Sequence, residues 1–240
     1  MTKWPDYQDL FKNCRDEIAI GEASTTYLHS EKAAIGIHQR FPEARLIAVL
    51  RQPVERAYSA FVMYHRENRE GNRHLLDAIG DEHLGKHYRG ESGVYLARGF
   101  YAEAVSRYFD LFGRDRLRVY LYEDFIQNPQ AMLDDLHGHI GVDAFAPDMS
   151  VTHNVGGLHK SGLLKSVLTR PNPVRYVARN LLPETFRVRM RERIKKLDLR
   201  KAPSFDAETW TTLLDRYRSD ILQLQDLIDR DLGHWLRPRP

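Results

Sequence analysis

The sequence predicts an α/β protein in which a parallel sheet is flanked by helices and followed by a C-terminal helical extension. Short apolar segments typical of strands alternate with segments whose apolar residues recur at helical spacing. Helices between consecutive strands favour right-handed crossovers, which join parallel strands. After Pro147 the chain is irregular, and two long helical stretches follow at 184–197 and 206–229.

Apolar spacing assigns the elements of the first third of the chain. We expect a short strand at 18–20, a helix at 30–40 and a strand at 45–50. The strand expected at 45–50 contains a run of branched apolar residues, which is typical of a strand that is buried on both faces. Pro53 suits the first turn of the following helix, which we expect at 53–69.

The middle of the chain contains a polar segment and the remaining sheet elements. Residues 70–91 are rich in Gly, His and charge, which predicts a loop with a short helix at 74–79. Long loops of this kind often form lids or substrate walls. We expect a helix at 101–112, a strand at 117–121 and a helix at 130–140, which complete the sheet layer.

The composition fits a globular enzyme domain with one core. The chain has 240 residues, of which 42% are hydrophobic and 29% are charged. No apolar run approaches the roughly 20 residues that a membrane-spanning helix requires. We assign residues 1–165 to an α/β domain and residues 166–240 to a helical extension of the same domain.

Cysteine and histidine usage bears on location and metal binding. Cys14 is the only cysteine, which excludes an internal disulfide and a cysteine-based metal site. The first residues carry no secretory signal, so a reducing cytoplasm is the simplest location. His74, His83 and His87 lie in the polar segment and are not expected to pair on one helix face, as a helical metal site requires, and we expect no metal.

Positive charge is concentrated towards the C-terminus. The net charge is only +3, but basic residues dominate between Arg170 and Lys201. Two readings remain open: a solvated helix face, or a surface that attracts an anionic glycan or an acidic membrane. Nucleic acid is not an expected partner, because the patterns typical of nucleic-acid binding are absent.

Arg51 directly follows the strand predicted at 45–50 and is a candidate anion ligand. In open α/β sheets, ligands dock at the carboxyl ends of the strands, where N–H groups face negative charge. An arginine adds a planar, permanently charged fork suited to phosphate. Ser59 supplies a hydroxyl to the same anion if the next helix leans over the strand end. The alternative to an anion site is that Arg51 follows a core strand and only faces solvent. Ser59 would then be a small residue where two helices make contact.

The pattern Arg-x-Pro-x-x-Arg-x-x-Ser at 51–59 resembles the 3′-phosphate-binding segment of sulfotransferases that use 3′-phosphoadenosine 5′-phosphosulfate (PAPS). Residues 21–28 are similar to the family's Gly-Glu-x-Ser-x-x-Tyr segment. Further similar segments are Gly99-Phe100-Tyr101, Phe109 to Phe112, Val119 to Phe125 and Asn128-Pro129. By order and spacing, most of residues 4–165 resemble the carbohydrate-type branch, including heparan-sulfate-like and bacterial members.

The resemblance implies a fold, a reaction and site residues. It implies a P-loop-NTPase-like sheet and transfer of a sulfuryl group from PAPS to an acceptor hydroxyl. The basic C-terminal half and the polar segment favour a glycan as the acceptor, and lipids and small metabolites are the alternatives. The resemblance also implies that Arg51 and Ser59 bind the 3′-phosphate of the cofactor. Relatives have a loop over the cofactor at 151–161, where Lys160 is the cationic candidate and an ordinary surface loop is the alternative.

Departures from the family pattern affect the expected activity. A Pro-Lys-x-Gly-Thr-Thr turn that binds the 5′-phosphosulfate normally precedes these segments and is not in this sequence, which therefore resembles a truncated domain. Ala23 stands where some amine-modifying relatives have a catalytic lysine. The alternative function is a catalytically impaired nucleotide- or glycan-binding remnant. A nucleotide kinase would need a phosphate loop and magnesium ligands, for which no motif is visible.

Overall fold

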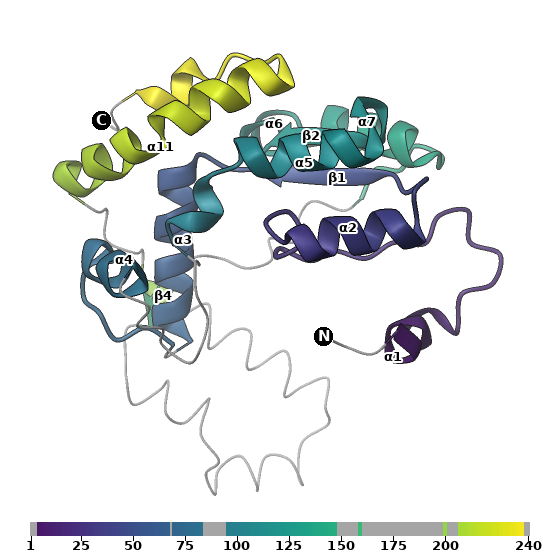
Figure 1. Ribbon diagram of the computed structural model, residues 1–240, viewed down its shortest axis with the longest axis horizontal. Helices are drawn as coiled ribbons and strands as arrows, with labels where there is room; N and C mark the ends of the chain where they lie inside the picture. The colour runs from purple at the N-terminus through teal and green to yellow at the C-terminus, as the bar shows by residue number, and fades with distance from the viewer. Residues whose placement is uncertain are drawn as a thin grey trace, which may run out of the picture. The chain divides into compact units, whose positions relative to one another are not determined.

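The computed structural model describes residues 4–67, 69–83, 95–147 and 206–237, with the backbone alone at 158–159 and 199–200 (Figure 1). The chain divides into two compact units that interleave along the sequence. The first unit contains residues 1–51, 101–148 and 224–230, and the second contains 52–100, 149–223 and 231–240. The assignment of 1–165 to one α/β domain with a helical extension at 166–240 stays a prediction.

Two parallel strands form the sheet of the first unit. They are β1 (Leu46–Leu50) and β2 (Leu117–Leu121), which confirms both strand predictions and the parallel arrangement (Figure 1). The strands are paired along their whole length, so that their last residues are partners. Arg51 and Tyr122, which follow these residues, therefore emerge at the same edge of the sheet.

One face of β1 is buried and the other is partly exposed. Ala48 and Leu50 are buried, whereas Ile47 and Val49 are 40% and 50% exposed. The expectation that this strand is buried on both faces is therefore wrong. A run of branched apolar residues favours strand conformation, but burial of a second face depends on elements that pack there from elsewhere in the chain.

Helices accompany the sheet of the first unit, and their ends have local causes. The helical elements are α1 (Trp4–Gln8), η1 (Asp9–Phe11), α2 (Glu31–Arg40), α5 (Ala102–Phe112), η4 (Arg114–Arg116), α6 (Tyr122–Gln127) and α7 (Pro129–Ile140). Ser30 and Asn128 begin α2 and α7, because their side chains accept hydrogen bonds from the exposed N–H groups of the first turn. Gly113 and Gly141 end α5 and α7 with positive φ angles, which glycine adopts without steric cost.

One predicted element of this unit is not found in the structure, and one of its helices was not predicted. Residues 18–20 are irregular, and Ile18 and Ile20 are 80% and 54% exposed, so the predicted strand is wrong. A three-residue alternation is not stable as a strand without a paired neighbour, and in the described part of this unit only β1 and β2 pair. Helix α6 is not visible in the sequence pattern, because its six residues contain too little of the helical period.

The second unit is built around α3 and part of α11. Its elements are α3 (Pro53–Arg66), α4 (Leu75–His83), η3 (Ala97–Gly99), the two-residue strands β3 (Leu158–His159) and β4 (Leu199–Arg200), and η5 (Gly233–Leu236). Helix α11 (Ala207–Ile228) begins in this unit and ends in the first. The buried side chain of Gln52 begins α3 by accepting from the N–H of Glu55, and it donates to the Trp235 carbonyl at 3.1 Å. The helix predicted at 184–197 lies outside the described residues.

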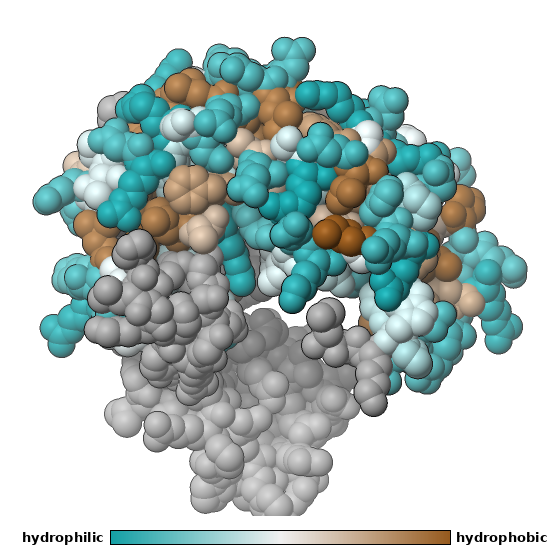
Figure 2. Space-filling model, viewed as in Figure 1, coloured by the Kyte–Doolittle hydropathy of each residue, from teal (hydrophilic) through white to brown (hydrophobic). Residues whose placement is uncertain are grey.

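No helix in the described ranges is long and apolar enough to cross a membrane. On the face drawn in Figure 2, apolar residues are interspersed with hydrophilic ones. Single exposed apolar residues of this kind are ordinary on protein surfaces and carry no functional meaning alone.

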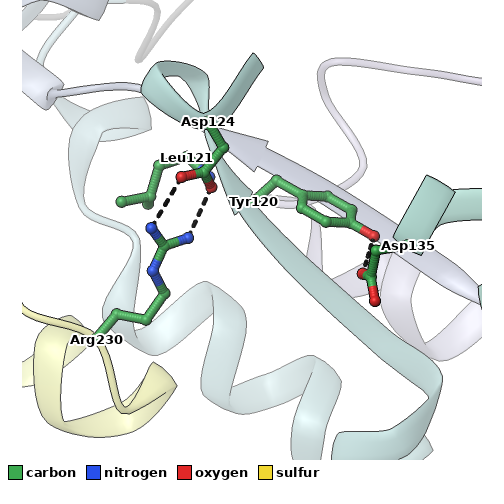
Figure 3. Close-up of polar contacts among 5 residues, drawn as sticks. All are labelled: Tyr120, Leu121, Asp124, Asp135 and Arg230. Atoms are coloured by element: carbon green, nitrogen blue, oxygen red, sulfur yellow. Dashed lines mark hydrogen bonds and ion pairs between the residues drawn. The ribbon is translucent and has the colours of Figure 1, made fainter. Parts of the chain in front are cut away.

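Asp124 joins the start of α6 to the segment that follows α11. Its carboxylate accepts the backbone N–H of Leu121 at 2.8 Å and two N–H groups of Arg230, at 2.7 and 2.9 Å (Figure 3). Hydrogen bonding to Asp124 raises the pKa of the Arg230 guanidinium, so the pair stays ionised. In the same view, the Tyr120 hydroxyl of β2 donates to Asp135 of α7 at 2.6 Å. These contacts fix both α6 and α7 to β2.

Replacing Asp124 with Ala should lower the free energy of unfolding by about 1–2 kcal/mol, because the change removes charged hydrogen bonds in a partly exposed place. Urea denaturation followed by circular dichroism measures this loss. Asp215→Ala is the matched control: Asp215 forms an exposed ion pair with Arg218 at 3.4 Å, and its loss should cost less than about 0.5 kcal/mol. Equal losses in the two variants would contradict the role given to Asp124.

Candidate anion-binding site

The backbone of Arg51 is held by a buried tyrosine. The hydroxyl of Tyr101, the residue before α5, donates to the Arg51 carbonyl at 2.9 Å. The Tyr101 carbonyl in turn accepts the first hydrogen bond of α5, from the N–H of Val105. Since Tyr101 is buried and tied to α5, the main chain at the carboxyl end of β1 is anchored, and the arginine side chain starts from a fixed point.

The side chain of Arg51 lies over an aromatic ring. Its Cζ atom is 5.2 Å from the ring centroid of Tyr122, the residue that follows β2. This distance is within the range of a cation–π contact, in which the ring face attracts the guanidinium. The carboxyl edge of the sheet therefore presents a permanent cation together with an aromatic side chain.

The Gly-Glu segment, residues 21–28, is organised around one carboxylate. Glu22 accepts hydrogen bonds from the hydroxyls of Tyr7 and Tyr27, at 3.0 and 2.7 Å. The hydrogen bond to Glu22, with burial as a smaller cause, raises the pKa of Tyr27 to about 12. The Tyr27 carbonyl accepts from the hydroxyl of Tyr108 in α5 at 2.8 Å. Glu22 and Tyr27 thus tie this segment to α1 and α5.

The three residues predicted to bind the cofactor lie in different parts of the chain. Arg51 has the placement described above and belongs to the first unit. Ser59 is exposed on α3 and belongs to the second unit, and Lys160 lies outside the described residues. Arg56, the second arginine of the 51–59 pattern, donates a hydrogen bond to the carbonyl of Tyr95. This hydrogen bond joins two segments of the second unit.

Tyr101 and Tyr122 are site residues that sequence reasoning did not single out. A signal for Tyr122 exists in the sequence: it follows the second predicted strand as Arg51 follows the first, and the carboxyl ends of parallel strands meet. Tyr101 lies in the Gly99-Phe100-Tyr101 segment that resembles the family, but no sequence signal indicates its contact with Arg51, which spans 50 positions of the chain.

The side chains at this edge suit an anion. A guanidinium offers several N–H donors in one plane, a geometry that matches phosphate and sulfate oxygens. Within the described ranges, no group of three or more His, Cys, Asp or Glu side chains is arranged to hold a metal ion. The guanidinium at this edge is suited to hydrogen bonding with a negative group and to charge attraction.

Comparisons with known proteins agree with this reading. The family model described as the sulfotransferase family matches residues 22–147, which is more than half of the chain. The chain belongs to the sulfotransferase family. A crystal structure of a sulfotransferase from Alicyclobacillus acidocaldarius is similar to this chain with a TM-score of 0.72 and 26% identity, over 99% of this chain and 75% of that one. A comparison with curated proteins finds no match.

Family membership confirms the resemblance inferred from the sequence motifs. The matched region contains Arg51, Ser59, Tyr101 and Tyr122, whereas Lys160 lies beyond it. The similarity to a sulfotransferase structure also supports the predicted α/β class, with its small parallel sheet and flanking helices. The residues assigned to cofactor binding remain predictions at this stage, because the comparisons assign no roles to individual residues.

The Tyr27–Glu22 contact should make stability depend on pH in the alkaline range. The pKa of Tyr27 is raised from 10.0 to about 12 in the folded chain, so folding favours the neutral hydroxyl. This stabilisation is fully present below about pH 10 and is lost as the pH rises through about 12. The difference in free energy of unfolding between wild type and Tyr27→Phe should therefore be constant from about pH 7 to 9 and shrink above pH 10. Urea denaturation across this range measures it, and a difference that stays constant to pH 12 would contradict the assignment.

Proposed function

We propose that this chain binds PAPS and transfers its sulfuryl group to an acceptor hydroxyl, on a glycan. The observation that carries the proposal is the placement of Arg51 at the carboxyl edge of a parallel strand pair, within a segment that resembles the family's 3′-phosphate-binding motif. Family and fold support sulfuryl transfer in general. We also propose that the parallel sheet has the strand arrangement of P-loop NTPases. The location that we propose for the protein is the cytoplasm.

In this proposal Arg51 binds the 3′-phosphate of the cofactor. Its anchored backbone and its planar cation fit a phosphate, which accepts two parallel hydrogen bonds from one guanidinium. We assign the hydroxyl of Ser59 to the same phosphate and the ammonium of Lys160 to a cofactor phosphate, on the strength of the sequence pattern. These residues lie away from the reacting sulfur, so that their contribution is binding and orientation.

The reaction is an in-line displacement at sulfur. Bound PAPS supplies the sulfuryl group, whose bond to the 5′-phosphate oxygen breaks as a bond to the acceptor oxygen forms. The acceptor hydroxyl gives its proton to a general base. Arg51 holds the nucleotide throughout by hydrogen bonding and charge attraction to the 3′-phosphate.

A glycan acceptor is supported by two features of the sequence. The ordered motifs resemble the carbohydrate-type branch of the family, and basic residues are concentrated between Arg170 and Lys201. A basic surface raises the local concentration of an anionic polysaccharide and speeds its association. Incubation of the full chain with PAPS and desulfated heparan-type polysaccharide, followed by mass spectrometry of disaccharides, tests this acceptor. Cofactor binding without transfer to any acceptor would instead support a binding remnant.

Replacing Arg51 with Ala should weaken binding of 3′-phosphoadenosine 5′-phosphate at least about tenfold, the scale of a charged hydrogen bond. The same change should leave the affinity for 5′-AMP nearly unaltered, because 5′-AMP lacks the 3′-phosphate. Calorimetric titration of the full chain with both ligands measures this. Arg218→Ala, which removes an exposed arginine of α11, is the control and should not alter either affinity. Undiminished affinity for the 3′-phosphorylated ligand in Arg51→Ala would remove the basis of the proposed site.

A further inference from the structure

Helix α2 presents two cations to solvent. Lys32 and Arg40 are exposed and belong to one row of residues that are spaced four apart along the helix. The helical rise places their Cα atoms about 12 Å apart. Gly36 lies midway in this row, so no side chain of the row stands between the two cations.

The guanidinium of Arg40 is held in place and keeps hydrogen-bond donors available. Its Cζ atom is 4.7 Å from the ring centroid of Trp4 in α1, and its Nη1 group donates to the Gly36 carbonyl at 3.2 Å. No other group among the described residues binds this side chain. Since a guanidinium carries several N–H groups in one plane, those that Gly36 does not use can bind an anion.

Neither cation is neutralised by a carboxylate. The Lys32 ammonium forms no ion pair or hydrogen bond with the described residues. Glu31 is the only acidic residue of α2, and in the described part of the chain neither Glu31 nor Asp6 of α1 pairs with Lys32 or Arg40. The positive charge of this face is therefore available to a ligand of opposite charge.

Apolar surface lies beside the cations. Phe41, which follows Arg40, is 45% exposed, and its ring centroid is 6.0 Å from that of Trp4. Ile35, in the exposed part of α2, is 40% exposed. Apolar side chains pack against the C–H faces of sugar rings, because the contact removes both from water. A carbohydrate with acidic groups would use the cations and the apolar surface together.

The spacing of the cations favours a linear polyanion over a small anion. One phosphate or carboxylate group cannot contact both Lys32 and Arg40 across about 12 Å. A polysaccharide with a carboxylate on each uronic acid presents anions at intervals along an extended chain, and it can reach both. Once the first contact has formed, the second is intramolecular, which raises the overall affinity.

We infer that the α2 face, defined by Lys32, Arg40 and Phe41, binds the chain of an acidic polysaccharide. The inference rests on the glycan acceptor of the proposed function and names a surface that retains this acceptor. It gives α2 no part in binding the nucleotide. Cofactor affinity and polysaccharide affinity should therefore respond to different substitutions.

Calorimetric titration of the full chain with a desulfated heparan-type octasaccharide tests the inference. Lys32→Ala and Arg40→Ala should each weaken binding about two- to fivefold, the size of one exposed charged contact, and the double variant about tenfold. Added salt should reduce these differences, because exposed charges are screened. All three variants should bind 3′-phosphoadenosine 5′-phosphate as wild type.

Two ligands and one variant are the controls. An octasaccharide whose carboxylates are reduced to alcohols should bind the wild type and the double variant equally. Polyglutamate should bind the wild type more weakly than the acidic octasaccharide, because it has no sugar rings to pack against Phe41. Arg118→Ala removes a cation of β2 that is 46% exposed and paired with Asp135 at 3.7 Å, and it should bind the octasaccharide as wild type.

The outcomes distinguish this inference from the proposed function. Unchanged octasaccharide affinity in the double variant overturns the inference and leaves the proposed function intact, as does polyglutamate that binds as well as the octasaccharide. If Arg40→Ala weakens both octasaccharide and nucleotide, its loss is structural, and Lys32→Ala decides, because its ammonium contacts no described residue. A wild type that binds the nucleotide but no octasaccharide overturns the inference and the glycan acceptor, and leaves the cofactor site standing.

Discussion

The in-register parallel pairing of β1 with β2 is the constraint on which the candidate site depends. Because Leu50 and Leu121 are partners, the next residues, Arg51 and Tyr122, leave the sheet together. A slip of one residue would turn the side chains of one strand to the opposite face and would separate the guanidinium from the ring. The contact between the Arg51 guanidinium and the Tyr122 ring is thus a consequence of the strand register.

Contacts that are remote in sequence hold this edge in place. The hydroxyl of Tyr101 reaches the Arg51 carbonyl over 50 positions, and Arg230 reaches Asp124 over 106 positions. The first contact ends on Arg51, directly after β1, and the second ends on Asp124, in the first turn of the helix that follows β2. Hydrogen bonds from side chains of distant segments therefore fix the main chain beyond the strand ends. A ligand that binds at this edge loses less free energy in ordering the residues that it contacts.

Much of the fold could be predicted because its signals are local. Pro53, Ser30 and Asn128 mark helix starts through dihedral preference and side-chain capping, and the apolar periods mark the longer helices and both strands. The signals failed where structure depends on neighbours: residues 18–20 have strand-like alternation but no strand to pair with, and Ile47 is apolar but not covered. For the site, Arg51 was predictable from its place after a strand, whereas Tyr101 required the folded chain.

The two arginines of the 51–59 pattern illustrate why a motif alone overstates a site. Both match the family spacing, and both carry the charge that a phosphate needs. Arg56 donates to the Tyr95 carbonyl and belongs to the internal hydrogen bonding of its unit, whereas Arg51 contacts the exposed ring of Tyr122 at the sheet edge. The two arginines of one sequence pattern thus contact different groups in the fold, so a match of spacing does not by itself assign them the same role.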